Sequence, residues 1–172
     1  MDKELIMKNH LILILLLTSL LSFGQNEFET LNGENYIIKY PNTWELNQSG
    51  QMGMTFGLFS PVGLYGDQFR ENVNLIEQDI SSQDLDLAGY IEVSENQIKT
   101  LLQASTIIES KREKDYHKII YTGTMGRYKL KFHQRYWVKN GNAYVLTFTA
   151  EIGEYDNYNE IALQIMDSFE FK

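Results

Sequence analysis

Two histidines, His117 and His133, come closest to a metal site in type and spacing. Zinc sites in proteins take their ligands from histidine, cysteine and carboxylate side chains. Whether the two imidazoles face each other depends on strand register, because a shift of one residue moves a side chain to the other face of a sheet. Two histidines without a partnering cysteine or carboxylate are a weak signal. We therefore expect no metal and no cofactor, and keep these two residues as the weak metal candidates.

Two pairs of carboxylates are close in sequence, Asp84 with Asp86 and Glu77 with Asp79. A calcium loop needs a further ligand and a glycine at fixed spacing, which neither pair has. We interpret them as helix-capping residues and a solvated strand face. The chain also lacks a G-x-S-x-G nucleophile motif and a glycine-rich loop between a strand and a helix. These observations predict a protein that is not an enzyme and has no catalytic residues.

Methionine and aromatic residues are concentrated between positions 52 and 65. Such side chains form adaptable apolar surfaces, but they also fill hydrophobic cores. Core packing is the simpler interpretation, and a surface for an apolar ligand or a partner is the alternative. The residues of this candidate surface are Met52, Met54, Phe56, Leu64 and Tyr65.

The segment Tyr128–Glu151 predicts two long strands joined at Asn140-Gly141, the strongest hairpin signal in the chain. A two-residue turn would pair Trp137 with Tyr144 and mix charged with apolar side chains on both faces. A three-residue loop that also includes the preceding lysine would pair Tyr136 with Tyr144 instead. This register gives one aromatic face and one basic face. We predict the three-residue loop because it separates the two kinds of side chain.

The remaining periodicity predicts an α+β fold, with antiparallel strands and two amphipathic helices. The first helix is expected to begin after the N-cap Asp86, and the second follows Glu151 with Asp156 as its cap and ends the chain. We expect one helix on each face of the antiparallel sheet, as in an α/β/α sandwich. The other expected strands are residues 36–40, 44–46, 54–60, 69–80, 107–113 and 116–122.

The N-terminus is expected to be a signal peptide at residues 1–24, followed by a flexible lead-in at 25–35 and a single domain at 36–172. Leu11–Leu21 is a continuous apolar run, shorter than the roughly 18 residues that a membrane-spanning helix requires. It precedes Ser22 and Gly24, which suit a cleavage site. The chain contains no cysteine, which excludes disulfides and a lipoprotein anchor. We expect a periplasmic or secreted protein.

The formal net charge is −8, so the chain would repel the phosphate backbone of a nucleic acid. The basic residues in the segment 129–135 form a local stripe that we interpret as a solvated strand face. We expect no nucleic-acid partner, no membrane span in the mature chain, and a monomer. The expected partner is an unknown protein or envelope component.

The segment Tyr36–Trp44, with its aromatic strand, Tyr-Pro and tryptophan, resembles the start of a PsbP-like domain. Glu71–Leu75, the hairpin Tyr136–Phe148 and Ser168-Phe169 fit the same family, so the resemblance covers Tyr36–Phe171. It implies the PsbP/Mog-type α/β/α fold of the bacterial exported branch. Members act mostly as binding, assembly or accessory factors without a common catalytic site. An exported, non-catalytic binding or accessory protein is therefore our first hypothesis. A periplasmic carrier of a small apolar ligand is the second, and a hydrolase is the third.

Overall fold

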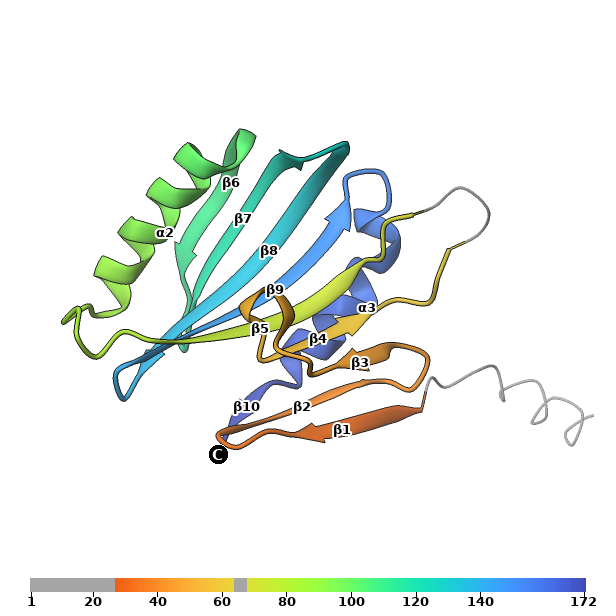
Figure 1. The fold of residues 1–172 in the computed structure, drawn as a ribbon, viewed down its shortest axis with the longest axis horizontal. Helices are drawn as coiled ribbons and strands as arrows, with labels where there is room; N and C mark the ends of the chain where they lie inside the picture. Colours follow the sequence, from red (N-terminus) through yellow and green to blue (C-terminus); the bar gives the residue numbers. More distant parts are fainter. Residues whose placement is uncertain (1–26, 64–67) are drawn as a thin grey trace, which may run out of the picture.

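The computed structural model describes residues 27–63 and 68–172, and these residues form two antiparallel sheets and two α-helices (Figure 1). The elements in chain order are β1 (Phe28–Asn32), β2 (Tyr36–Pro41), β3 (Glu45–Asn47), the short 3₁₀ helix η1 (Gln51–Gly53), β4 (Phe56–Phe59), β5 (Asn72–Asp79), α2 (Leu87–Leu101), β6 (Gln103–Arg112), β7 (His117–Met125), β8 (Tyr128–Lys139), β9 (Asn142–Glu151), α3 (Tyr155–Asp167) and β10 (Glu170–Phe171). The predicted α+β class is confirmed.

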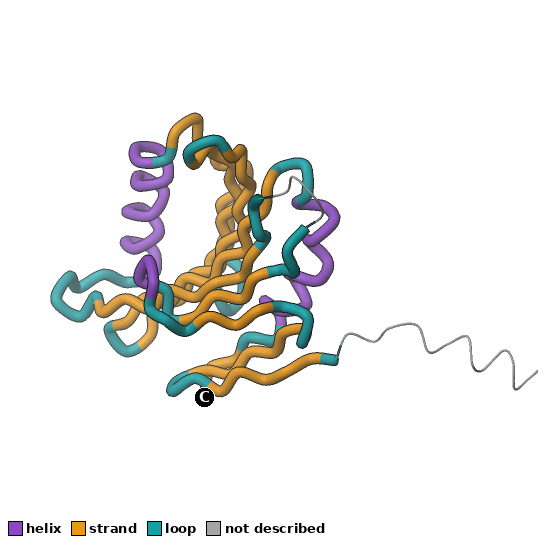
Figure 2. The backbone as a smooth tube through the Cα atoms, turned by 45° about the vertical axis from the view of Figure 1, so that its right-hand side comes forward, coloured by secondary structure: helices purple, strands orange, loops and turns teal. Residues whose placement is uncertain are grey.

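The large sheet has seven strands in the order β3-β4-β5-β9-β8-β7-β6, and the small sheet has three in the order β1-β2-β10. Figures 1 and 2 show the small sheet at one end of the molecule, beside the C-terminus. The second helix does not end the chain as predicted, because β10 follows it and places Phe171 opposite Tyr36 of β2. A two-residue strand that is held by a distant partner leaves no local periodicity in the sequence.

Strand β1 lies within the segment that was expected to be a flexible lead-in. Only Leu31 of its five residues is buried, so the strand shows no alternation of polar and apolar side chains. Its backbone pairs with β2 from Phe28 opposite Pro41 to Asn32 opposite Ile37. Backbone pairing depends little on side-chain type, which is why the sequence pattern did not indicate this strand.

The hairpin β8–β9 has a two-residue turn, with Lys139 opposite Asn142 and Trp137 opposite Tyr144. The prediction of a three-residue loop was therefore wrong. Asn140 and Gly141 both adopt positive φ angles, of 52° and 76°, as a tight turn between twisted strands requires. The prediction assumed that the face with the basic side chains of β8 would be exposed to solvent. That face is buried as well, so the separation of charged from apolar side chains does not determine the register.

Alternate residues of β8 and β9 belong to two separate hydrophobic clusters, on opposite faces of the large sheet. The cluster that includes residues of α3, here the α3 cluster, consists of Leu31, Tyr36, Ile38, Tyr40, Trp44, Phe56, Leu58, Val73, Leu75, Tyr144, Leu146, Phe148, Ala150, Tyr155, Ala162, Ile165, Met166 and Phe169. The cluster that includes residues of α2, here the α2 cluster, consists of Ile91, Ile98, Ile119, Tyr121, Leu130, Phe132, Tyr136 and Val145.

Helix α2 begins where its capping signal predicted. The Asp86 carboxylate accepts a hydrogen bond from the Gly89 backbone N–H at 2.8 Å, which pairs one of the free N–H groups of the first turn. Helix α3 differs from the prediction, because Glu154 is at its N-cap position and makes no side-chain capping bond. Asp156 lies in the first turn instead, where a negative charge is favourable beside the positive end of the helix dipole.

Two basic residues of β8 are buried on the side of the α3 cluster. Arg135 donates to the Met166 carbonyl oxygen at 3.1 Å and to the Asp167 carboxylate at 2.6 Å, at the C-terminal end of α3. His133 is only 7% exposed, and its pKa is lowered to about 4, first by burial and then by the charges of Arg135 and Lys118. The structure thus holds the His133 imidazole in its neutral form at physiological pH.

We predict that His133 makes stability fall in mild acid. In the unfolded chain the imidazole gains a proton below its ordinary pKa of 6.5, whereas the folded ring stays neutral down to about 4. The contribution of His133 is therefore complete above 6.5 and is lost as the pH falls towards 4, by at most about 3 kcal/mol. Urea unfolding at about pH 7 and about pH 4.5 measures it, and His133→Leu should show a weaker pH dependence than the wild type. The account of His133 is contradicted if both proteins lose the same free energy between the two pH values.

We also predict that Gly141→Ala destabilises the protein by about 1 kcal/mol or more. Gly141 has a φ angle of 76°, and an added Cβ would lie 3.1 Å from the Cβ of Ser81. Gly153→Ala is the matched control, since it meets nothing within 4 Å. Urea unfolding should show a change within about 0.5 kcal/mol for the control. Equal stabilities of the two variants would argue against a specific role for this turn.

Candidate functional site

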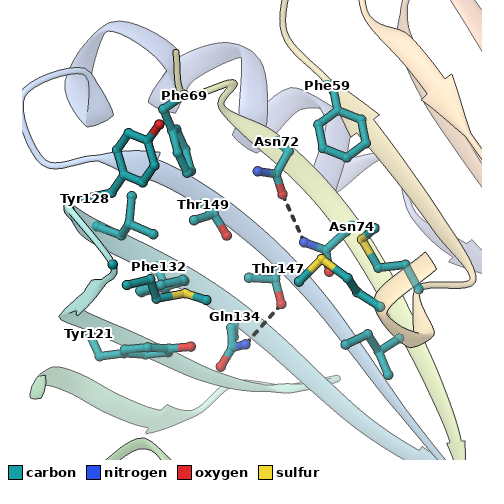
Figure 3. Close-up of a pocket in the computed structure, with 16 residues that line it drawn as sticks. Phe59, Phe69, Asn72, Asn74, Tyr121, Tyr128, Phe132, Gln134, Thr147 and Thr149 are labelled. Carbon is teal, nitrogen blue, oxygen red and sulfur yellow. Dashed lines mark hydrogen bonds between the residues drawn. The ribbon is translucent and has the colours of Figure 1, made fainter. Parts of the chain in front are cut away.

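A cleft with a cavity volume of about 600 Å³ opens on the large sheet, on the same face as the α2 cluster (Figure 3). Its sides come from η1, β4 and the start of β5 on one hand, and from the β7–β8 hairpin on the other. Three strands, β5, β9 and β8, are hydrogen-bonded neighbours beneath it. Segments that are far apart in the sequence therefore meet at this cleft.

The floor of the cleft is a band of uncharged polar side chains across these three strands. The strand registers place Asn72 opposite Thr149, and Thr147 opposite both Asn74 and Gln134. The Gln134 amide donates to the Thr147 hydroxyl at 3.0 Å, and the Asn74 amide donates to the Asn72 side-chain oxygen at 3.0 Å (Figure 3). We call these five residues the polar band. Its amides and hydroxyls can both donate and accept hydrogen bonds.

Aromatic rings form the walls. Tyr121 and Phe132 stack with their ring centroids 4.5 Å apart and an interplanar angle of 14°. The rings of Phe69 and Tyr128, at another part of the wall, have their centroids 5.1 Å apart (Figure 3). The guanidinium of Arg127 lies over the Tyr128 ring at 4.9 Å and donates to the Tyr128 hydroxyl at 2.7 Å. These contacts hold the β7–β8 turn in place beside the cleft.

Three methionines complete the lining, and two of them are exposed. Met52 is 79% exposed and Met125 is 47% exposed, whereas Met54 is partly buried. Met52 also has a positive φ angle of 56° within η1, a backbone conformation that residues other than glycine rarely adopt. Exposed large apolar side chains around a cleft are typical of an interaction site. Methionine suits such a place because its long side chain adapts to different shapes.

The described lining of the cleft contains no charged side chain. Among the described residues that form it, none is Asp, Glu, Lys, Arg, His or Cys. Burial raises the pKa of the Tyr121 hydroxyl, so this group remains protonated. What this arrangement can do is bind a molecule by apolar contact and neutral hydrogen bonds.

The structure separates the residues of the candidate apolar surface. Met52 and Met54 line the cleft together. Phe56 does not line it, since this residue is fully buried in the α3 cluster, opposite Leu75. Leu64 and Tyr65 lie outside the described residues.

Sequence reasoning missed the polar band. Its signal is present in the alternation of Asn72-Val73-Asn74-Leu75 in β5 and of Thr147-Phe148-Thr149-Ala150 in β9, which puts polar residues on one face. The incorrect hairpin register hid it, because that register placed the two threonines on the same face as the basic residues of β8. The observed register brings Gln134 opposite Thr147 instead.

The two histidines lie on opposite faces of the sheet. His117 is paired with Tyr136, a member of the α2 cluster, and His133 is paired with Phe148, a member of the α3 cluster. The His117 ring nitrogen lies 2.8 Å from the Ser110 hydroxyl, and burial lowers the pKa of His117. Within the part of the chain that the structure describes, no group of three or more His, Cys, Asp or Glu residues could hold a metal ion.

A second cavity, of about 430 Å³, lies on the other face beside Arg135, Trp137 and Asp167. The Arg135 guanidinium already binds Asp167 and the Met166 carbonyl, and it lies over the Tyr116 ring at 4.9 Å. Its two terminal nitrogens, Nη1 and Nη2, therefore serve the packing of α3 against β8. The first cleft remains the stronger candidate for a functional site.

Comparison with known proteins gives structural relatives only. No protein-family model and no curated protein sequence matches the chain. Of the described helices, none combines the length and the apolar character that crossing a membrane would require.

Several solved structures match over most of their length. The solution structure of cyanobacterial PsbP from Synechocystis sp. PCC 6803 aligns with a TM-score of 0.64 at 15% identity, over 88% of this chain and 96% of that chain. LpqN of Mycobacterium tuberculosis, which is involved in cell envelope biogenesis, aligns with a TM-score of 0.58 at 11% identity, over 87% and 92%. PA94 of Pseudomonas aeruginosa, of unknown function, aligns with a TM-score of 0.58 at 12% identity, over 83% and 95%. At these identities the likeness concerns the fold, and the chain has the PsbP-like fold that its sequence resemblance implied.

Proposed function

We propose that this chain is an exported, non-catalytic binding protein that acts through the cleft above the polar band. The observation that carries the proposal is a ligand-sized cleft whose described lining is largely apolar and carries no charge. Its volume of about 600 Å³ lies within the range of about 300–1,000 Å³ that is typical of small-molecule sites. A largely apolar wall with a few convergent polar groups is also typical of such sites.

The layering of the fold explains why the cleft stays open. We infer an α/β/α arrangement, in which α3 covers one face of the large sheet and α2 covers part of the other (Figure 2). Helix α2 contacts β6 and β8 and packs on residues such as Ile119 and Tyr136. This leaves the face of β5 and β9 beyond the helix for a ligand.

Export is supported by the N-terminal sequence, in which the apolar run Leu11–Leu21 precedes small residues. The absence of cysteine from the chain fits a product without disulfides or a lipid anchor. The similarity of fold to LpqN, a protein of cell envelope biogenesis, supports an accessory role in the envelope.

The proposal predicts that an uncharged apolar dye such as Nile red binds in the cleft. Asn74→Trp should fill the cavity and weaken binding at least about tenfold, since the bulky indole occupies the space of the ligand. Gly57 lies opposite Asn74 on β4, and the Phe59 ring packs over this glycine, so the new indole would extend into the cleft beside Phe59. Fluorescence titration measures the dissociation constant, and thermal unfolding verifies that the variant folds.

Gln97→Trp adds the same side chain on the exposed face of α2 and should leave binding unchanged. Ile76→Trp, at another lining position, provides a second cavity-filling variant. No dye binding by the wild type, or equal binding by the cavity-filling and control variants, would refute the proposed binding site. Robust turnover in a broad screen of hydrolase substrates would refute the non-catalytic assignment.

A further inference from the structure

We infer that the cleft selects an uncharged amphiphile, with an apolar chain that ends in a neutral group such as a hydroxyl or an ester. This inference rests on the proposed function, and it adds the chemical class of the ligand. It depends on three properties of the cleft. These are the absence of charge in its described lining, the composition of the polar band, and the flexible apolar side chains of Met52 and Met125 at its rim.

The first property is the placement of charge around the cleft. Its described lining contains no ionisable acid or base, although 22% of the whole chain is charged. The lysines of β8 alternate with the lining residues Leu130 and Phe132, so they point to the other face, where Lys131 lies 3.8 Å above the Tyr155 ring. Arg127, in the nearby turn, donates to both Gln68 and Tyr128. A charged head group would lose its hydration in the cleft without gaining a counterion there.

The second property is the hydrogen-bonding capacity of the polar band. The Asn74 amide uses one N–H in its bond to Asn72, and the Gln134 amide uses one in its bond to Thr147. The Gln134 side-chain oxygen also accepts a hydrogen bond from the Tyr136 hydroxyl. A primary amide has two N–H donors and an oxygen with two lone pairs, so each of these side chains still has one N–H free of these bonds. A neutral hydroxyl group can both donate and accept, and an ester oxygen can accept. Such a head group matches the floor without adding a charge.

The third property is the apolar rim. Met52 and Met125 are exposed, and aromatic rings such as Phe69 and Tyr121 continue the apolar surface inward. Burying these groups under an alkyl chain would remove their apolar surface from water, which favours binding. The flexible thioether side chains fit a chain of variable shape better than a rigid, specific ligand.

The test compares three molecules with the same chain of about ten carbons. They are the neutral 1-decanoylglycerol, anionic decanoate and cationic decyltrimethylammonium, each used below its micelle concentration to displace Nile red from the wild-type protein. We expect the neutral molecule to bind at least about tenfold more tightly than either ion, because the described lining of the cleft offers no counterion for a charge. Equal or tighter binding of either ion overturns the inference.

A charge placed in the polar band tests where the head group lies. Asn74→Asp should weaken decanoate binding and strengthen decyltrimethylammonium binding, each by about threefold or more, through the new carboxylate. Asn96→Asp adds the same charge on the exposed face of α2 and should change neither by more than about twofold. If the two variants behave alike, the head group does not lie at the polar band and the inference fails.

The two levels of the proposal fail in different ways. A wild-type protein that does not bind the dye, or binds it outside the cleft, refutes the proposed function itself. Dye binding that depends on the cleft, together with a preference for a charged chain, leaves the binding function standing and removes only the ligand class.

Discussion

The register of the β8–β9 hairpin is the constraint on which the rest of the structure depends. Its two-residue turn at Asn140-Gly141 sets Trp137 opposite Tyr144 and Gln134 opposite Thr147. A shift by one residue would reverse the facing of one strand relative to the other. The aromatic residues of the α3 cluster and the polar band of the cleft would then each lose their partners. The core on one face and the candidate site on the other therefore follow from the same turn.

The same register explains how basic residues come to be buried. Arg135 binds Asp167 and a carbonyl at the end of α3, where a positive charge also complements the helix dipole. The long side chains of Lys131 and Lys139 lie over the rings of Tyr155 and Phe171 at 3.8 and 4.1 Å. The basic stripe, which the sequence suggested to be a solvated strand face, is therefore partly packed against aromatic rings. The described lining of the cleft, on the opposite face, contains no charged side chain.

Local signals in the sequence were enough for the α+β class, the hairpin, the cap at Asp86 and the resemblance to PsbP-like domains. They were not enough where distant backbone pairing decides, as in β1 and β10, which show no periodicity of their own. Only part of the polar band could be recognised in the sequence. Asn72 and Asn74 alternate with apolar residues in β5, but their alignment with Gln134 depends on the register of the strands. Met52 and Met54 both line the cleft, whereas Phe56 begins β4 and is buried in the α3 cluster.

The most direct test of the central claim is side-chain amide NMR during titration with 1-decanoylglycerol. The NH₂ signals of Asn72, Asn74 and Gln134 lie in the polar band, whereas those of Asn96 and Gln97 lie on the exposed face of α2. The account predicts that the first three signals shift in a saturable manner and that the other two do not. Saturable shifts that spare the polar band, or a titration that moves none of these signals, would contradict it.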